Sequence, residues 1–206
     1  MARYTGPKNR LARREGIDLG MKTVGSHAHA QLLKRLGMPP GQHGQKRRRK
    51  QSNFAIQLRE KQKVKRLYGV LERQFRKYFE QSKKWKGNTG EMLLQYLERR
   101  LDNVLYRIGF APTRASARQL VSHGHVLVDG AKVDIPSFMV AVGQVVTIKP
   151  KSLEMPLVKK MLEEKTFAAP EWLERSGPAG KILRLPQRSD VTEDISEQLI
   201  VEHYSR

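Results

Sequence analysis

The residues with the most obvious chemical potential form a run of five consecutive cations: Lys46, Arg47, Arg48, Arg49 and Lys50. A loop of small and polar residues, GQHGQ, precedes the run, and its glycines allow a ligand to approach the backbone closely. Neighbouring unit charges repel one another by about 0.5–1 kcal/mol per pair even in water. We therefore expect the run to resist compact order when free and to become ordered against phosphate groups, although a mobile tail or a sorting signal would have a similar composition.

Other reactive groups are sparse. The chain contains no cysteine, which excludes disulfides, thiolate metal sites and cysteine nucleophiles. His27 and His29 have no carboxylate close by in the sequence, so we predict no metal site there. His123 and His125 flank a glycine just before a β-rich segment, which favours a polar turn or an RNA contact. With no Walker loop or dinucleotide fingerprint either, the sequence predicts neither a metal nor a cofactor.

One tripeptide has an alternative catalytic interpretation. Residues 100–102, Arg-Leu-Asp, resemble the catalytic element of some pseudouridine synthases, in which it belongs to a separate and larger catalytic domain. Here Leu101 falls on the apolar stripe of a predicted helix, and the chain has too few remaining residues for such a domain. We therefore predict that Asp102 is structural and that the chain is not an enzyme.

The positive charge that accompanies these residues is unevenly distributed. The 206 residues have a formal net charge of +20, and residues 1–90 contain 24 of the 40 Lys and Arg residues but only 5 of the 20 acidic ones. A solubility strategy would spread the excess, whereas a confined excess indicates a region dedicated to binding a polyanion. No apolar run approaches the roughly 20 residues needed to span a bilayer, so we predict no membrane span.

The elements that must position these cations begin after an N-terminal segment, residues 1–51, that is predicted to be irregular. Ser52 is a candidate N-cap, and an apolar stripe then runs from Val64 to Phe79 at helical spacing. Gly69 is a point at which this segment would split into two helices. The opposite face is predicted to be almost entirely positive, with Arg59, Arg66, Arg73, Lys77 and Lys84.

In the second half of the chain, the spacing of the apolar residues changes from a helical pattern to one that includes β-strands. Two more helices are predicted, one over residues 89–108 that ends at Gly109 and a shorter one capped by Thr113. A β-hairpin about Asp129-Gly130 and a strand over 143–149 follow. A helix over 153–165, strand-like pieces over 171–185 and a last helix over 193–204 complete the chain. The predicted fold class is α+β: an extended N-terminal arm, an all-helical domain, and an inserted α/β domain with an αα-hairpin and a small, mostly antiparallel sheet.

The sequence also resembles that of a known protein family. The segment LERRLDNVLYRIGFAPTRASARQLVSHGHVLVDGAKVDIPS, residues 97–137, resembles the S4 RNA-binding domain. The flanking motifs ARREG, PPGQHGQ, LREKQKVKRLYGVLERQFRKYF and QLIVEHYS are similar to those of bacterial-type small-subunit ribosomal protein S4. Some members of that family hold zinc with cysteines near the N-terminus, where this chain has Asn9 and Ala12, so no zinc site is expected here.

The resemblance implies a structural constituent of the small ribosomal subunit that binds 16S-type ribosomal RNA at a helix junction in the 5′ domain and nucleates assembly. It also implies a role in translational fidelity, possible autoregulation of the operon messenger, and contact with ribosomal proteins S3 and S5 and with messenger RNA near its channel. The implied location is the cytoplasm, ribosome-bound and monomeric within the ribosome, with an organelle containing bacterial-type ribosomes left open.

The resulting domain prediction is a basic arm over 1–51, a helical domain over 52–90 completed by residues 191–206, and an inserted domain over 91–190 with the RNA-binding module at about 97–157. The rRNA-binding residues are predicted partly from charge and partly from the family resemblance: Arg3, Lys46, Arg47, Arg48, Arg49, Lys50, Arg59, Arg66, Arg73, Lys77, Arg107, Arg114, Arg118 and His123.

Two other readings stay open from the residues alone. An RNA-modifying or tRNA-handling enzyme could use the same domain as an anchor, but it would need a catalytic domain. A DNA-binding or heat-shock RNA-binding module could share the domain, but that reading leaves the first 50 residues and the C-terminal helix unexplained.

Overall fold

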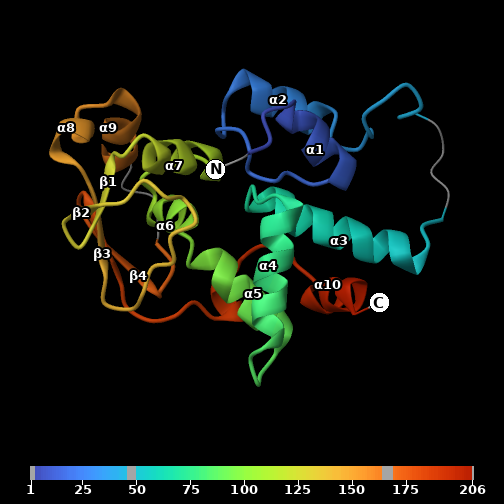
Figure 1. Ribbon diagram of the computed structural model, residues 1–206. Coiled ribbons are helices and arrows are strands. Elements are labelled where there is room, and N and C mark those ends of the chain that lie inside the picture. The colour runs from blue at the N-terminus through green and yellow to red at the C-terminus, as the bar shows by residue number, and fades with distance from the viewer. Residues whose placement is uncertain (1–2, 46–49, 164–168, 206) are drawn as a thin grey trace. The chain divides into compact units, whose positions relative to one another are not determined.

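The computed structural model describes residues 3–45, 50–163 and 169–205, and the predicted contacts Lys46 to Arg49 therefore lie outside the described residues. The chain divides into two compact units (Figure 1). One is formed by the chain up to Gly90 together with the residues from Glu193 onward, and the other runs from Glu91 to Thr192. The first is helical and the second combines helices with a five-stranded sheet, so the α+β fold class is confirmed.

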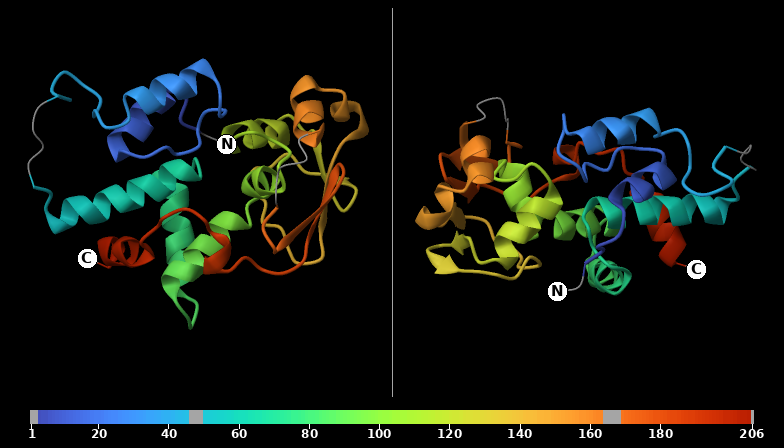
Figure 2. Two further views of the ribbon diagram at one scale, coloured as in Figure 1. Left: turned by 180° about the vertical axis from the view of Figure 1, so that it is seen from behind. Right: turned by 90° about the horizontal axis from the view of Figure 1, so that it is seen from above.

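The helical unit is built on α3 (Asn53–Leu67), α4 (Glu72–Lys83) and α10 (Glu197–Tyr204). The predicted cap of α3 is confirmed, because the Ser52 hydroxyl accepts a hydrogen bond from the backbone N–H of Ala55 at 3.3 Å. Gly69, at φ 62°, separates α3 from α4, and the apolar stripe is buried on both helices. Helix α10 packs against α3, as two views show (Figure 1 and Figure 2).

The N-terminal segment is more ordered than its composition indicates. The prediction of irregular structure was wrong for α1 (Lys8–Glu15) and α2 (His27–Lys34), which pack against each other. Both helices have only eight residues, too few to show a clear apolar period. They are held by a small core in which Ala12, Leu19 and Leu32 are each only 1% exposed.

In the other unit the predicted helix over 89–108 is broken in two, α5 (Thr89–Glu98) and α6 (Leu101–Ile108). The reason is tertiary: Arg100 is extended and forms a β-bridge with Met139, and the Leu101 N–H donates to the Phe138 carbonyl at 2.9 Å. Gly109, at φ 85°, ends α6 as predicted. Helix α7 (Arg114–Ser122) is capped by the Thr113 hydroxyl, also as predicted.

The sheet is antiparallel, with strand order β2-β1-β3-β5-β4. The Asp129-Gly130 hairpin is confirmed, since both residues have positive φ, 49° and 81°, as a type I′ turn requires. The strands are β1 (Val126–Val128), β2 (Ala131–Lys132), β3 (Val145–Ile148), β4 (Leu173–Ser176) and β5 (Ala179–Ile182). Residues of α6 and α7 form one continuous apolar core with those of β1, β3 and β5.

Three further elements complete the fold. The predicted helix over 153–165 is replaced by α8 (Pro150–Leu153) and α9 (Pro156–Glu163), because Pro156 begins a new helix, and the end of the prediction lies outside the described residues. A short 3₁₀ helix, η1 (Arg188–Asp190), follows the sheet. Helix α10 begins four residues later than predicted, while Ile195, just before it, is buried.

Candidate nucleic-acid interface

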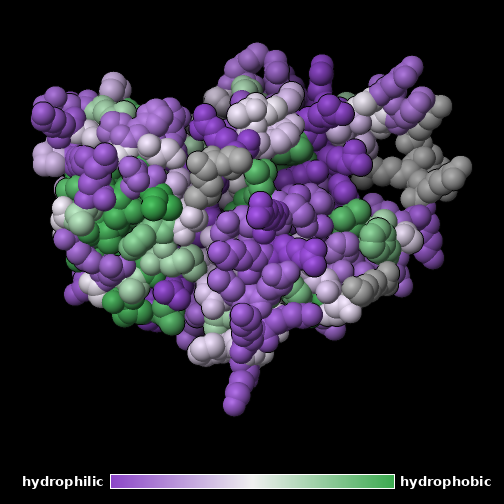
Figure 3. All heavy atoms as spheres, viewed as in Figure 1, coloured by the Kyte–Doolittle hydropathy of each residue, from purple (hydrophilic) through white to green (hydrophobic). Residues whose placement is uncertain are grey.

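Helix α4 presents two cations to solvent. Arg73 and Lys77 lie four residues apart, so they share one face, and both are exposed. The described residues offer neither of them a carboxylate partner within ion-pair distance. Buried Phe75, Tyr78 and Phe79 fix the opposite face of the helix in the core. The surface over α4 is hydrophilic (Figure 3), and its two unpaired cations are available to a polyanion.

The two predicted cations of α3 are in a different state. Arg59 donates to a Glu15 carboxylate oxygen at 3.3 Å, and Arg66 makes a second, shorter ion pair with the same oxygen. The Glu15 side chain is only 2% exposed. Burial raises the pKa of Glu15 and lowers the pKa of Arg66, because both charges have lost water, while their mutual attraction opposes both shifts. The three groups together carry a net charge of about +1 instead of the +2 that α3 alone indicates.

A second carboxylate neutralises further cations of the helical unit. Glu72, at the start of α4, accepts hydrogen bonds from Lys61 and Lys65, each at 2.8 Å, and from the Tyr204 hydroxyl at 2.8 Å. Burial alone raises the pKa of Glu72, but these three hydrogen bonds outweigh it and lower the pKa from 4.5 to about 2. Burial and the contact with Glu72 raise the pKa of Tyr204 above its ordinary value. The cluster ties α3, α4 and α10 together and reduces the charge of the two lysines from +2 to a net +1.

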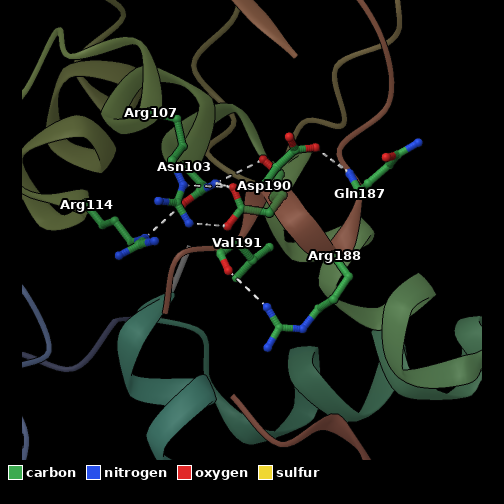
Figure 4. A network of polar contacts seen from close by, with 8 residues as sticks. Asn103, Arg107, Arg114, Gln187, Arg188, Asp190 and Val191 are labelled. Carbon is green, nitrogen blue, oxygen red and sulfur yellow. Dashed lines mark hydrogen bonds and ion pairs between the residues drawn. The ribbon is translucent and has the colours of Figure 1, made fainter. Parts of the chain in front are cut away.

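Two of the arginines predicted in the other unit, Arg107 and Arg114, belong to a polar cluster around the buried carboxylate of Glu98. Arg107 makes a bidentate pair with Glu98, at 3.0 and 2.7 Å, and Asn103 donates to the same carboxylate at 2.7 Å. Arg114 donates to the Asn103 side-chain carbonyl at 2.8 Å and lies over the Tyr106 ring. Figure 4 shows the three labelled side chains, from α6 and α7, pointing toward one another. Both Arg107 and Arg114 are largely buried, at 8% and 9% exposure.

Asp102 belongs to a neighbouring ion-pair cluster. Arg100 donates to its carboxylate at 3.0 and 2.6 Å, and Arg118 lies 3.6 Å from the same group. Asp102 is 4% exposed. In the structure Asp102 is thus the carboxylate that joins Arg100 and Arg118 inside this unit, and its structural role stays a prediction.

The C-terminal end of this unit is fixed by polar contacts of its own. Arg184 makes a bidentate pair with Asp190, at 2.6 and 2.7 Å, and the Gln187 N–H donates to the same carboxylate at 2.7 Å. Arg188 donates to the Val191 carbonyl at 2.9 Å, as the lower part of Figure 4 shows. These contacts hold the chain in place where it leaves the sheet.

The remaining predicted residues lie apart from these clusters. Arg3 and Lys50 are exposed. His123 is exposed at the end of α7, and its ring lies 6.1 Å from that of His125. His125 is anchored to the Ser152 hydroxyl at 2.8 Å. Among the described residues of the prediction, Arg59, Arg66, Arg107 and Arg118 are therefore paired with carboxylates, whereas Arg73 and Lys77 are not.

The N-terminal helices show what stands where some family members carry zinc ligands. Asn9 donates to the Ala28 carbonyl at 2.9 Å and so joins α1 to α2, while Ala12 fills the small core. His29 contacts the Asp18 carboxylate at 2.7 Å. Over the described ranges, no group of three His, Cys, Asp or Glu residues is arranged to hold a metal ion. Packing and hydrogen bonds order this part of the chain.

Glu15 is the residue that sequence reasoning missed. It lies 44 and 51 residues from the arginines that it pairs with, and no local pattern predicts a contact over that distance. Its only signal is its position in α1, a helix that composition did not reveal.

Within the described part of the chain, no helix is both long enough and apolar enough to cross a membrane.

Comparison with known proteins places the chain in a family. Residues 3–98 match the ribosomal protein S4/S9 N-terminal domain, and residues 99–146 match the S4 domain. Small ribosomal subunit protein uS4A of Symbiobacterium thermophilum is 52% identical over 208 aligned positions that cover both chains completely. The uS4 proteins of Parabacteroides distasonis and Chloroflexus aurantiacus are 52% and 51% identical, again over both complete chains. The chain therefore belongs to the uS4 family of small-subunit ribosomal proteins.

Proposed function

We propose that this chain is a structural, non-enzymatic constituent of the small ribosomal subunit and binds its ribosomal RNA. The observation that carries the proposal is the identity of more than 50% over the full length with proteins named for that subunit. The excess of positive charge in the first 90 residues, 24 Lys and Arg against 5 acidic residues, supports it independently, because such an excess needs a polyanion to neutralise it.

The RNA-binding residues divide by mechanism. Arg73 and Lys77 would contact phosphates with their full positive charge. Arg59 and Arg66 are both paired with the carboxylate of Glu15, so together they offer a net charge of about +1. We include Arg107, Arg114 and Arg118 as positioned donors, which would contact RNA through their guanidinium edges. Since the major groove of A-form RNA is inaccessible to side chains, the protein would recognise junction shape, phosphates and 2′-hydroxyls. The remaining proposed contacts are Arg3, Lys46, Arg47, Arg48, Arg49, Lys50 and His123.

The finer function follows from the family resemblance and is part of the same proposal. The RNA target is a multi-helix junction in the 5′ domain of 16S-type RNA, where binding nucleates subunit assembly. Ribosomal proteins S3 and S5 and the messenger RNA channel are its proposed neighbours, and the protein acts as a monomer in cytoplasmic ribosomes. An effect on fidelity and repression of its own operon messenger are proposed as secondary roles.

In the proposed domain organisation, residues 1–51 form a basic arm that contacts RNA. Residues 52–90, completed by 191–206, form the helical domain. The inserted domain spans 91–190 and contains the S4 module at about 97–157. Each part therefore contributes cations to the proposed RNA contact, and the first two carry most of the positive charge.

A filter-binding competition tests the proposal. The labelled probe is a transcript of the small-subunit 5′ domain, and the competitors are unlabelled transcript, tRNA and duplex DNA of matched length at the same salt concentration. We expect only the unlabelled transcript to compete efficiently, because specific binding exceeds non-specific electrostatic binding by several orders of magnitude. If tRNA or duplex DNA competes equally well, the ribosomal assignment is wrong.

A further inference from the structure

The turn between α4 and α5, residues 84–88, carries an exposed tryptophan. Trp85 is 61% exposed, the second-highest value among the large hydrophobic residues that are exposed in the described chain. Trp172, the other tryptophan of the protein, is completely buried. An exposed indole offers a large flat apolar and π surface to a partner, and the residues around it decide which kind of partner fits.

The surroundings of Trp85 are strongly positive. Lys83, Lys84 and Lys86 are all exposed. The segment 81–90 contains no acidic residue, and the preceding carboxylate, Glu80, already pairs with Arg76 at 3.0 Å. A partner that covers the indole must therefore also bring negative charge.

The turn is built to hold the indole in place. The backbone N–H of Trp85 donates to the Ser82 carbonyl at 3.2 Å, which extends the last turn of α4. The Gly90 N–H donates to the Asn88 side-chain oxygen at 3.0 Å and fixes the start of α5. Gly87 lies against the indole, since a methyl group on its Cα would come within 3.1 Å of two indole atoms. The side chain is thus exposed on a backbone that is already ordered, which lowers the entropic cost of binding.

We propose that Trp85 stacks on an unpaired RNA base, with Lys83, Lys84 and Lys86 contacting the phosphates on either side of it. An aromatic platform surrounded by cations matches both parts of a nucleotide, the π-face of the base and the charge of the phosphate. A protein partner would instead have to present an apolar side chain surrounded by carboxylates. No feature of this turn favours such a partner over a nucleotide. The inference rests on the proposed function and adds a single-stranded subsite to it.

The first test is affinity. We compare Trp85→Ala and Trp85→Phe with the wild-type chain on the 5′-domain transcript. Loss of one aromatic–base stack should weaken binding by about 5- to 140-fold in Trp85→Ala. Trp85→Phe should retain most of the affinity, because phenylalanine preserves a π-face. Since the side chain is exposed, neither variant should alter folding. Equal affinities of wild type and Trp85→Ala would overturn the inference.

The second test uses the fluorescence of Trp85 itself. In a Trp172→Phe variant Trp85 is the only tryptophan, and in Trp85→Phe only the buried Trp172 emits. Stacking on a base should quench the Trp85 emission when the transcript is added, while the Trp172 emission stays constant. If the Trp85 emission is unchanged in the saturated RNA complex, the base contact does not exist and the inference is wrong.

The lysines are tested by charge removal with a matched control. Changing Lys83, Lys84 and Lys86 to Gln should lower the slope of log affinity against log salt by about 2, because each lost phosphate contact contributes about 0.7 on a single strand. The control changes three exposed lysines of the other unit, Lys159, Lys160 and Lys181, and should leave the slope unchanged. An equal change in both triple variants would contradict a defined subsite at the turn.

These experiments separate the inference from the function on which it rests. If the wild-type chain does not prefer the 5′-domain transcript to duplex DNA, the proposed function fails. If the wild-type chain shows that preference, and Trp85→Ala shows it with the same affinity, only the stacking subsite fails.

Discussion

The sharpest prediction compares two groups of cations that the sequence alone treats as equivalent. Arg73 and Lys77 on α4 are exposed and have no carboxylate partner among the described residues. Arg59 and Arg66 on α3 share the buried Glu15. The double variant Arg73→Gln with Lys77→Gln therefore removes two available charges. The triple variant that changes Arg59, Arg66 and Glu15 to Gln removes a net charge of only one.

The magnitude follows from counterion release. Each phosphate contact contributes about 0.7–0.9 to the slope of log affinity against log salt. The α4 double variant should thus lose about 1.4–1.8 from the slope, and about 25- to 60-fold in affinity at 0.1 M salt. The triple variant should lose about half as much slope. Because it removes all three members of the ion-pair cluster, it does not leave Glu15 buried without a partner.

The assay is filter binding to the 5′-domain transcript over a range of salt concentrations. Urea unfolding of each variant, measured in parallel, establishes that the proteins compared are folded. Equal slopes for both variants would show that Glu15 does not neutralise the α3 arginines. A wild-type slope in the α4 double variant would show that Arg73 and Lys77 do not contact phosphate, and either result would refute the reasoning.

Three further predictions concern the framework that holds these residues. Because the pKa of Glu72 is lowered to about 2, its contribution to stability is fully present above about pH 4.5 and is lost as the pH falls toward 2. The fall from 4.5 to about 2 corresponds to about 3.4 kcal/mol, which screening of its 44% exposed side chain reduces to about 1–2 kcal/mol. Urea unfolding of Glu72→Gln should show that loss at pH 7 and a smaller difference from wild type at pH 3, whereas a difference that does not depend on pH would contradict it. Thr113→Ala removes the cap of α7 and should cost about 1 kcal/mol in the same assay, with Thr113→Ser retaining most of the stability and an unchanged midpoint counting against the cap. Gly180→Ala places a methyl group 2.5 Å from Ile108 Cδ1 and should cost about 1–3 kcal/mol, which adding Ile108→Val should partly restore; a stability equal to that of wild type would show that the core adapts freely.

Local signals in the sequence were sufficient for some features. Ser52 and Thr113 were recognisable as N-caps because a hydroxyl just before a helix commonly accepts a hydrogen bond from a backbone N–H of its first turn. Asp129-Gly130 predicted its hairpin because few residue pairs tolerate positive φ at both positions. Gly109 likewise marked the end of α6.

Features determined by distant parts of the chain were not predictable in this way. The break at Arg100 depends on pairing with Met139, 39 residues later, which interrupts an otherwise continuous helical pattern. The state of Arg59 and Arg66 depends on Glu15, which belongs to a helix too short to show its period. The sequence identified which residues are basic, but only the tertiary structure distinguished paired cations from unpaired ones.

The central claim is that this chain recognises a defined site on small-subunit ribosomal RNA through its cationic helical unit. Hydroxyl-radical footprinting of the full-length chain on the 5′-domain transcript tests it most directly. We predict a compact set of protected nucleotides at a helix junction, with protection weakened in the Arg73→Gln, Lys77→Gln double variant and restored by a higher protein concentration. Weak, uniform protection along the whole transcript, unchanged in the variant, would contradict the account.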